Sequence, residues 1–152
     1  MANHKQKVLE ILEREGWSYR EEEENVLFLA SYGTRKWKMT IHCTEKGQIS
    51  CYAAYPWPVP EIRLSKVLAG LNVLNQQQLR GCFFLCSSPS RVLYRCGVQI
   101  LDEYTSYEAI EDILLTTVAV VNTHWPKVYS LLFGLDEGFP NMQLIKEANQ
   151  DE

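Results

Sequence analysis

The clearest pattern in this chain lies in residues 37–55, which read WKMTIHCTEKGQISCYAAY. Apolar and polar side chains alternate on both sides of a short loop that contains Gly47. Such alternation is typical of β-strands that bury one face, and a loop with glycine between two of them indicates a hairpin. A three-residue loop would give Gly47 a left-handed conformation and pair Thr44 with Gln48. The predicted cross-strand pairs on the buried face are Ile41 with Cys51, Met39 with Ala53, and Trp37 with Tyr55.

The segments on either side of this hairpin predict three helical regions and three further strands. The helices are expected around residues 5–15, 61–75 and 105–134, the last kinked or restarted at Pro126, and the strands around residues 26–32, 82–86 and 92–100. The order α-β-β-β-α-β-β-α predicts an α+β domain, an antiparallel sheet of about five strands with helices packed on it. We expect a single domain over residues 1–134 and an acidic C-terminal tail over 135–152, where Met142–Ala148 has the pattern of a short helix. The run Glu21–Glu24 is interpreted as a solvated turn or the exposed side of an edge strand.

The formal net charge of −4 is distributed unevenly along the chain. Residues 1–24 carry 7 acidic and 4 basic side chains, whereas residues 25–101 carry 2 acidic and 9 basic ones, a net charge of +7. Residues 102–134 and 135–152 each carry 5 acidic side chains and one lysine. We expect the basic middle to be compensated mainly by the protein's own acidic helices. An acidic protein partner and nucleic acid stay open as alternatives, although a sequence pI near 5.4 disfavours nucleic acid.

Several basic and aromatic side chains are candidates for contact with a partner. The hairpin register places Lys38, Thr40 and His42 on the face turned away from the core. Trp57 lies between two prolines in an extended segment, where packing over the sheet and contact with a partner are equally compatible with its position. The full set of candidate partner-binding residues is Lys38, His42, Trp57, Arg80, Arg91 and Arg95.

Catalytic and metal-binding patterns are absent from the sequence. The five cysteines are an odd number and none stands in a C-x-x-C pair, so we expect free thiols, no metal site and no cofactor. His42 and Cys43 are adjacent in a strand and therefore point to opposite faces, which argues against a catalytic dyad. No apolar run approaches 18 residues and the N-terminus lacks a secretory pattern. We expect a cytoplasmic protein that neither binds a membrane nor catalyses a reaction.

Residues 5–134 resemble the YbjN-like family, whose fold is similar to that of type III secretion chaperones. The resemblance rests on the order and spacing of short landmarks: residues 55–60 (YPWPVP), 71–75 (LNVLN), 81–83 (GCF), 92–95 (VLYR), and the final helix closing through Pro126 to Gly134. After Arg95 the strand reads CGVQI, where family members commonly have a more apolar, Leu-Pro-like stretch. The family consists mostly of small bacterial proteins regarded as candidate sensory-transduction regulators, without established catalytic residues.

The resemblance implies a non-enzymatic protein-binding module, chaperone-like or regulatory, with a protein partner of unknown identity. By analogy with related chaperone folds, it also implies a homodimer. The alternative hypothesis is a small-ligand sensor that uses a pocket between the sheet and the last helix.

Overall fold

The computed structural model describes residues 4–134. Within these residues the chain forms one six-stranded antiparallel sheet, with the strand order β1-β2-β3-β4-β6-β5, and four α-helices. Short 3₁₀ turns, at Glu61–Arg63 and Glu103–Thr105, precede the second and third helices. The elements in chain order are α1 (His4–Arg14), β1 (Tyr19–Glu22), β2 (Asn25–Tyr32), β3 (Arg35–Cys43), β4 (Gln48–Pro58), α2 (Leu64–Gln76), β5 (Cys82–Ser87), β6 (Ser90–Gln99), α3 (Ser106–Thr123) and α4 (Trp125–Phe133).

The central hairpin has the register that its sequence predicts. In the β3–β4 ladder, Ile41 pairs with Cys51 and Met39 with Ala53. The Thr44 amide donates to the Gln48 carbonyl at 3.0 Å, and Gly47 has a φ of 82°, as a three-residue hairpin loop requires. The regular ladder ends at the pair Lys38–Ala54, so the predicted pairing of Trp37 with Tyr55 lies just beyond it.

The sheet has six strands rather than the predicted five. The additional strand is β1, which pairs antiparallel with β2 and forms one edge of the sheet. Glu21 and Glu22 lie in this strand, and Glu23, at a φ of 54°, lies in the turn that leads into β2. The acidic run is therefore partly an edge strand and partly a turn, which are the two alternatives expected for it. The pairing of this strand with β2 was not predicted.

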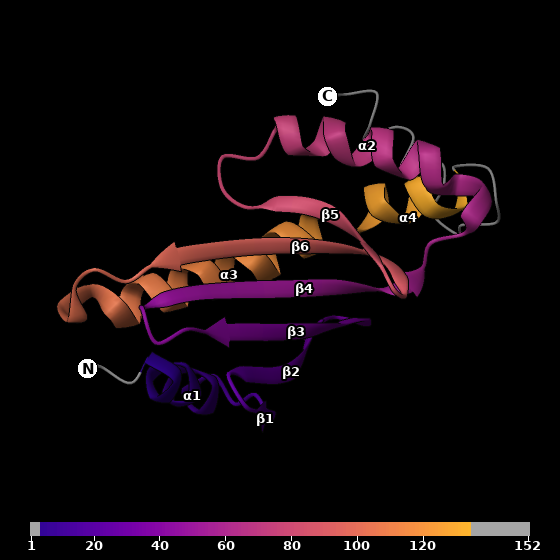
Figure 1. Cartoon of the computed structure of the whole chain (residues 1–152). Coiled ribbons are helices and arrows are strands. Elements are labelled where there is room, and N and C mark those ends of the chain that lie inside the picture. Colours follow the sequence, from indigo (N-terminus) through magenta and orange to yellow (C-terminus); the bar gives the residue numbers. More distant parts are fainter. Residues whose placement is uncertain (1–3, 135–152) are drawn as a thin grey trace.

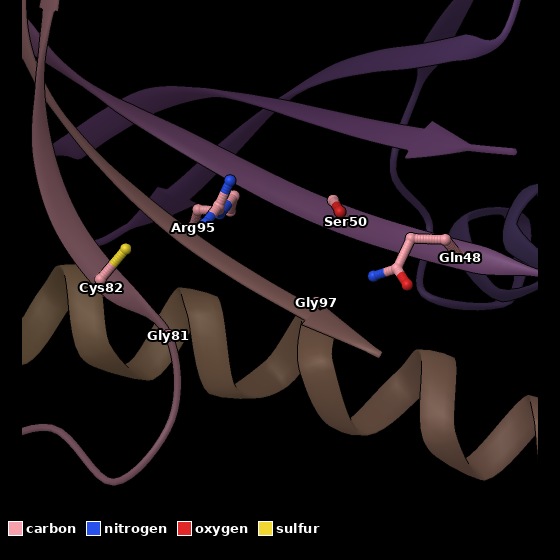
Figure 2. Close-up of a pocket in the computed structure, with 6 residues that line it drawn as sticks. All are labelled: Gln48, Ser50, Gly81, Cys82, Arg95 and Gly97. Carbon is pink, nitrogen blue, oxygen red and sulfur yellow. The ribbon is translucent and has the colours of Figure 1, made fainter. Parts of the chain in front are cut away.

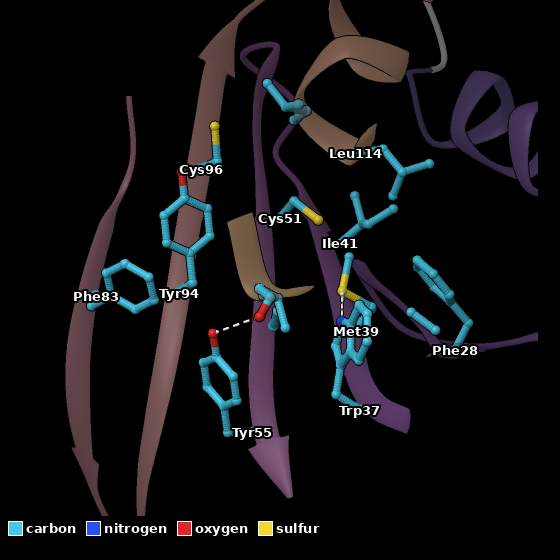
Figure 3. Packing of buried hydrophobic residues seen from close by; sticks show 14 of the residues in the cluster. Phe28, Trp37, Met39, Ile41, Cys51, Tyr55, Phe83, Tyr94, Cys96 and Leu114 are labelled. Carbon is cyan, nitrogen blue, oxygen red and sulfur yellow. Dashed lines mark hydrogen bonds between the residues drawn. The ribbon is translucent and has the colours of Figure 1, made fainter. Parts of the chain in front are cut away.

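The helices cover one face of the sheet. Figure 1 shows α3 crossing behind β4 and β6, with α2 and α4 lying together near β5. Alternate side chains of the strands point toward these helices and form the core that Figure 3 shows in part. The Tyr55 hydroxyl donates to the Val121 carbonyl of α3 at 3.0 Å, and the rings of Trp37 and Trp125 lie 5.7 Å apart.

Pro126 separates the last two helices as predicted. α3 ends at Thr123 and α4 begins at Trp125, so that the proline lies in the first turn of a new helix, where its missing N–H costs no hydrogen bond. α4 packs against α2, and a Cβ placed on Gly70 would meet the Leu131 side chain at 2.3 Å. The predicted tail over 135–152, with its helical pattern at Met142–Ala148, lies outside the described residues.

Candidate functional site

The sheet face opposite the helices has no helix packed on it within residues 4–134. We call it the open face. It consists of the side chains that alternate with the buried ones along β2 to β6. Its members are Leu27, Leu29, Lys36, Lys38, Thr40, His42, Ser50, Tyr52, Ala54, Cys82, Phe84, Cys86, Arg91, Leu93, Arg95 and Gly97.

A mostly apolar row, interrupted by Lys38, runs across the middle of the open face. The register aligns Leu29, Lys38, Ala54, Leu93 and Phe84 side by side on five strands. Leu29 keeps 62% of its surface exposed. Apolar side chains in neighbouring strands form a continuous surface, and a soluble protein leaves such a surface uncovered mainly where something else binds.

Basic side chains lie beside this row, and in the case of Lys38 within it, without acidic partners among residues 4–134. Lys36, Lys38 and Arg95 are exposed and form no ion pair or hydrogen bond with the described residues. Arg91 uses one donor on the Pro56 carbonyl, at 2.7 Å, and forms no ion pair with the residues that the structure describes. The expectation that the protein's own acidic helices neutralise these bases is therefore wrong for the open face, because the helices lie on the other side of the sheet.

Charge compensation does occur at the rim of the sheet. Arg80, just before β5, donates to Asp112 of α3 at 2.5 Å, and this hydrogen bond raises the pKa of the guanidinium. Arg14 of α1 pairs with Glu111 of the same helix, α3. Both acids that α3 presents here are thus used in holding the helical layer together or to the sheet rim.

The structure brings together some of the six candidate residues predicted from sequence and separates others. Lys38, His42, Arg91 and Arg95 lie on the open face. His42 is partly occupied there, with Nδ1 2.8 Å from the Asn25 side-chain oxygen and Nε2 3.7 Å from Glu24.

The other two candidates lie away from the open face. Arg80 is bound to Asp112 at the rim, as described above. Trp57 is on the helix side, where its ring packs edge-on against Trp125 at 4.7 Å and Tyr129 at 5.1 Å. Of the two alternatives that the sequence left open for Trp57, packing over the sheet and contact with a partner, the structure shows packing.

A hollow of about 580 Å³ lies at the β4–β6–β5 side of the open face. Figure 2 shows its lining: Gln48 and Ser50 from β4, Arg95 and Gly97 from β6, and Gly81 and Cys82 at the start of β5. Two further hollows, of about 550 and 210 Å³, adjoin Lys38 and Leu29 farther across the same face. Sequence reasoning found Arg95 but not the hollow, because residues 48–50 and 95–97 come together only through the β4–β6 register.

The thiols of Cys43 and Cys51 are buried in the core. Burial raises the pKa of Cys43 to about 11 and that of Cys51 to about 12, so both remain protonated near neutral pH. All five cysteines are free. Over the described part of the chain, no cluster of three or more His, Cys, Asp or Glu side chains is placed to hold a metal ion. Among residues 4–134, no helix is both long and apolar enough to cross a membrane.

Comparison with known proteins identifies the architecture. No family model matches the chain, and no curated protein matches it. Among solved structures, it is similar to the crystal structure of YbjN from E. coli, described as a candidate transcription regulator, with a TM-score of 0.55. The two sequences are 15% identical, and the match covers 79% of this chain and 92% of the other. The fold is YbjN-like.

The likeness to YbjN confirms the resemblance stated from sequence and, at this identity, concerns the fold alone. The YbjN-like arrangement puts the helices on one sheet face, and large side chains fill the space between that face and the last helices. Tyr55, Trp37 and Trp125 form this packing, with ring centroids 5.6–5.7 Å apart for the contacts to Trp125. These rings occupy part of the space in which the sensor hypothesis places its pocket, and that hypothesis stays a prediction.

Proposed function

We propose that this protein is a non-enzymatic protein-binding module, chaperone-like or regulatory, that binds an acidic and partly apolar segment of a partner protein on the open face. The observation that carries the proposal is the open face itself, a mostly apolar row with bases in and beside it that have no acidic partners among residues 4–134. The likeness to a candidate regulator supports a regulatory role without specifying its partner.

Two physical effects favour such a partner. Covering the apolar row removes Leu29, Leu93 and Phe84 from water, which is favourable at roughly 25 cal/mol per Å² before ordering costs are subtracted. Acidic side chains of the partner would meet Lys36, Lys38, Arg91 and Arg95, and such charge complementarity accelerates association and fixes register. Nucleic acid is less well matched, because apolar side chains occupy the middle of the face.

The test is selection of short random peptides on the purified protein, followed by affinity measurement on variants. The double variant Lys36→Glu with Lys38→Glu reverses two unpaired charges on the open face. The matched control, Lys66→Glu with Lys127→Glu, makes the same change on exposed positions of α2 and α4. We expect acidic, apolar-containing peptides whose affinity falls about tenfold or more in the open-face variant and is unchanged in the control. Equal affinity for both variants would refute the proposal.

We further propose that the protein acts as a homodimer, through a surface separate from the open face. The outward side of α2 supports this, because Leu68 and Val73 are about half exposed and Leu79, just after the helix, is fully exposed. Light scattering after gel filtration should give the mass of two chains, and Leu68→Glu should give the mass of one. A wild-type mass of one chain would contradict the dimer and leave the open-face proposal intact.

We also place this activity in the cytoplasm. The five unpaired thiols support a reducing compartment, since cysteines that remain free are typical of such surroundings.

A further inference from the structure

The hollow beside Arg95 collects hydrogen-bond donors that have no acceptor among the described residues. The Arg95 guanidinium, the Ser50 hydroxyl and the Gln48 side-chain amide all line it. Arg95 is the only ionised group in this lining, which contains no acidic side chain. Figure 2 shows the three side chains along the two neighbouring strands, β4 and β6, on the same side of the sheet.

Gly97 keeps part of the hollow open. A Cβ on Gly97 would lie 3.2 Å from the Ile49 carbonyl oxygen, 3.3 Å from Ser50 Oγ and 3.4 Å from Gln48 Nε2, which would crowd two of the donors. The bare backbone at this position lets the two donors of β4 lie over β6 with space beside them.

We propose that this hollow is a carboxylate subsite, which binds an aspartate or glutamate side chain of the partner segment. The proposal rests on the proposed function and adds the position and chemistry of one contact. A guanidinium presents a planar pair of donors that matches a carboxylate, and Ser50 and Gln48 add neutral donors. One positive charge balances one carboxylate, whereas a phosphate dianion would leave a charge uncompensated in the hollow.

The strand geometry also sets what lies next to this carboxylate. Leu93 is two residues before Arg95 on the same face of β6, and two residues of a strand span roughly 6.6–6.8 Å. Leu93 pairs with Phe84 on one side and Ala54 on the other, so an apolar surface adjoins the subsite at this spacing. An extended ligand has the same repeat. The subsite therefore selects an acidic residue and an apolar residue separated by one position, in an extended segment.

Cys82 provides a reporter inside the hollow. Its thiol lines the site and is half-buried, whereas Cys86, four residues along β5 on the same face, lies opposite Arg91 outside this hollow. The probes are capped peptides of the sequence Ala-Thr-Asp-Thr-Leu-Thr-Ala, with twins that carry asparagine or phosphoserine in place of the aspartate. Affinity is measured by NMR titration, and the rates of iodoacetamide alkylation of Cys82 and Cys86 are measured by peptide mapping.

We expect the aspartate peptide to bind about fivefold more tightly than the asparagine peptide and to slow alkylation of Cys82 more than that of Cys86. Arg95→Gln should abolish this preference, and Gly97→Ala should weaken it. Lys66→Gln, which removes a positive charge from an exposed position of α2, should leave it unchanged. NMR spectra with native dispersion for each variant exclude loss of the fold as the cause.

Each other outcome overturns the inference. Equal affinity for the aspartate and asparagine peptides overturns the carboxylate subsite. The proposed function would still stand in that case if the peptides selected on the open face lose affinity in the Lys36→Glu, Lys38→Glu variant. Tighter binding of the phosphoserine peptide identifies a phosphate site instead. Protection of Cys82 without peptide identifies a second copy if it depends on protein concentration. If it does not, and is relieved by amide substitutions of the acids in 135–152, it identifies the chain's own C-terminal segment as the occupant.

Discussion

Two neighbouring residues of β2 test directly whether the open face is uncovered. Phe28 points into the core, is 6% exposed and stacks on Trp17 with ring centroids 5.1 Å apart. Leu29 points the other way and is 62% exposed. Phe28→Ala leaves a cavity and should lower the free energy of unfolding by about 3–5 kcal/mol. Leu29→Ala removes a side chain that is less than half buried, so its cost should be about 1 kcal/mol or less.

The assay is urea unfolding of the wild type and both variants, monitored by circular dichroism at several protein concentrations. Phe28→Ala should also lower Tm by roughly 10–20 °C, against a few degrees for Leu29→Ala. A loss of more than about 2 kcal/mol for Leu29→Ala would show that this side chain is covered in solution. If that loss grew with protein concentration, the cover would be a second copy, and the open face would be a dimer interface rather than a site for a partner segment.

Two further predictions concern positions that the fold constrains. Gly81→Ala should destabilise the protein by about 2 kcal/mol or more, measured by urea unfolding, because its φ of 66° disfavours other residues and the added Cβ would meet the Tyr94 hydroxyl at 2.4 Å; an unchanged midpoint would contradict the geometry at the start of β5. The raised pKa values of Cys43 (about 11) and Cys51 (about 12) mean that the unfolded chain releases these protons first, near pH 9. The contribution of these thiols to the free energy of unfolding should therefore be fully present below pH 9 and be lost as the pH rises, by about 1 kcal/mol per thiol at pH 10. Urea unfolding at a series of pH values measures this loss, which should be smaller in Cys51→Ala.

The sequence predicts the central hairpin and its exposed side correctly because the information is local. Alternation over residues 37–55 and the position of Gly47 determine both the register and the direction of Lys38. The pairing of the edge strand β1 with β2 was not predicted, because β1 has only four residues, three of them charged and exposed, and no alternation to detect. Its pairing depends on β2, whose run of apolar residues hides which side is buried.

Two features could not be predicted in the same way: the hollow, and the absence of a helix on the open face within residues 4–134. Ser50 and Gly97 are neighbours because the chain leaves the sheet after β4, forms α2 and returns with β6 beside β4. Nothing in a single segment specifies that return. The side on which the helices pack is also a property of the whole fold, so a tally of charge by segment could not show whether acids and bases would face each other.

The places where the acidic side chains of α3 are bound explain why the open face remains basic. The described helices do carry acids, but Glu111 and Asp112 of α3 are bound to Arg14 and Arg80 at the rim and within the helical layer. These contacts use acidic side chains to fix the helices on one side of the sheet. Lys36, Lys38 and Arg95 on the other side are then left without acidic partners among residues 4–134. Acids and bases that nearly cancel in number are thus separated by the thickness of the sheet. This separation gives an acidic protein a basic surface, the surface on which we propose that an acidic partner binds.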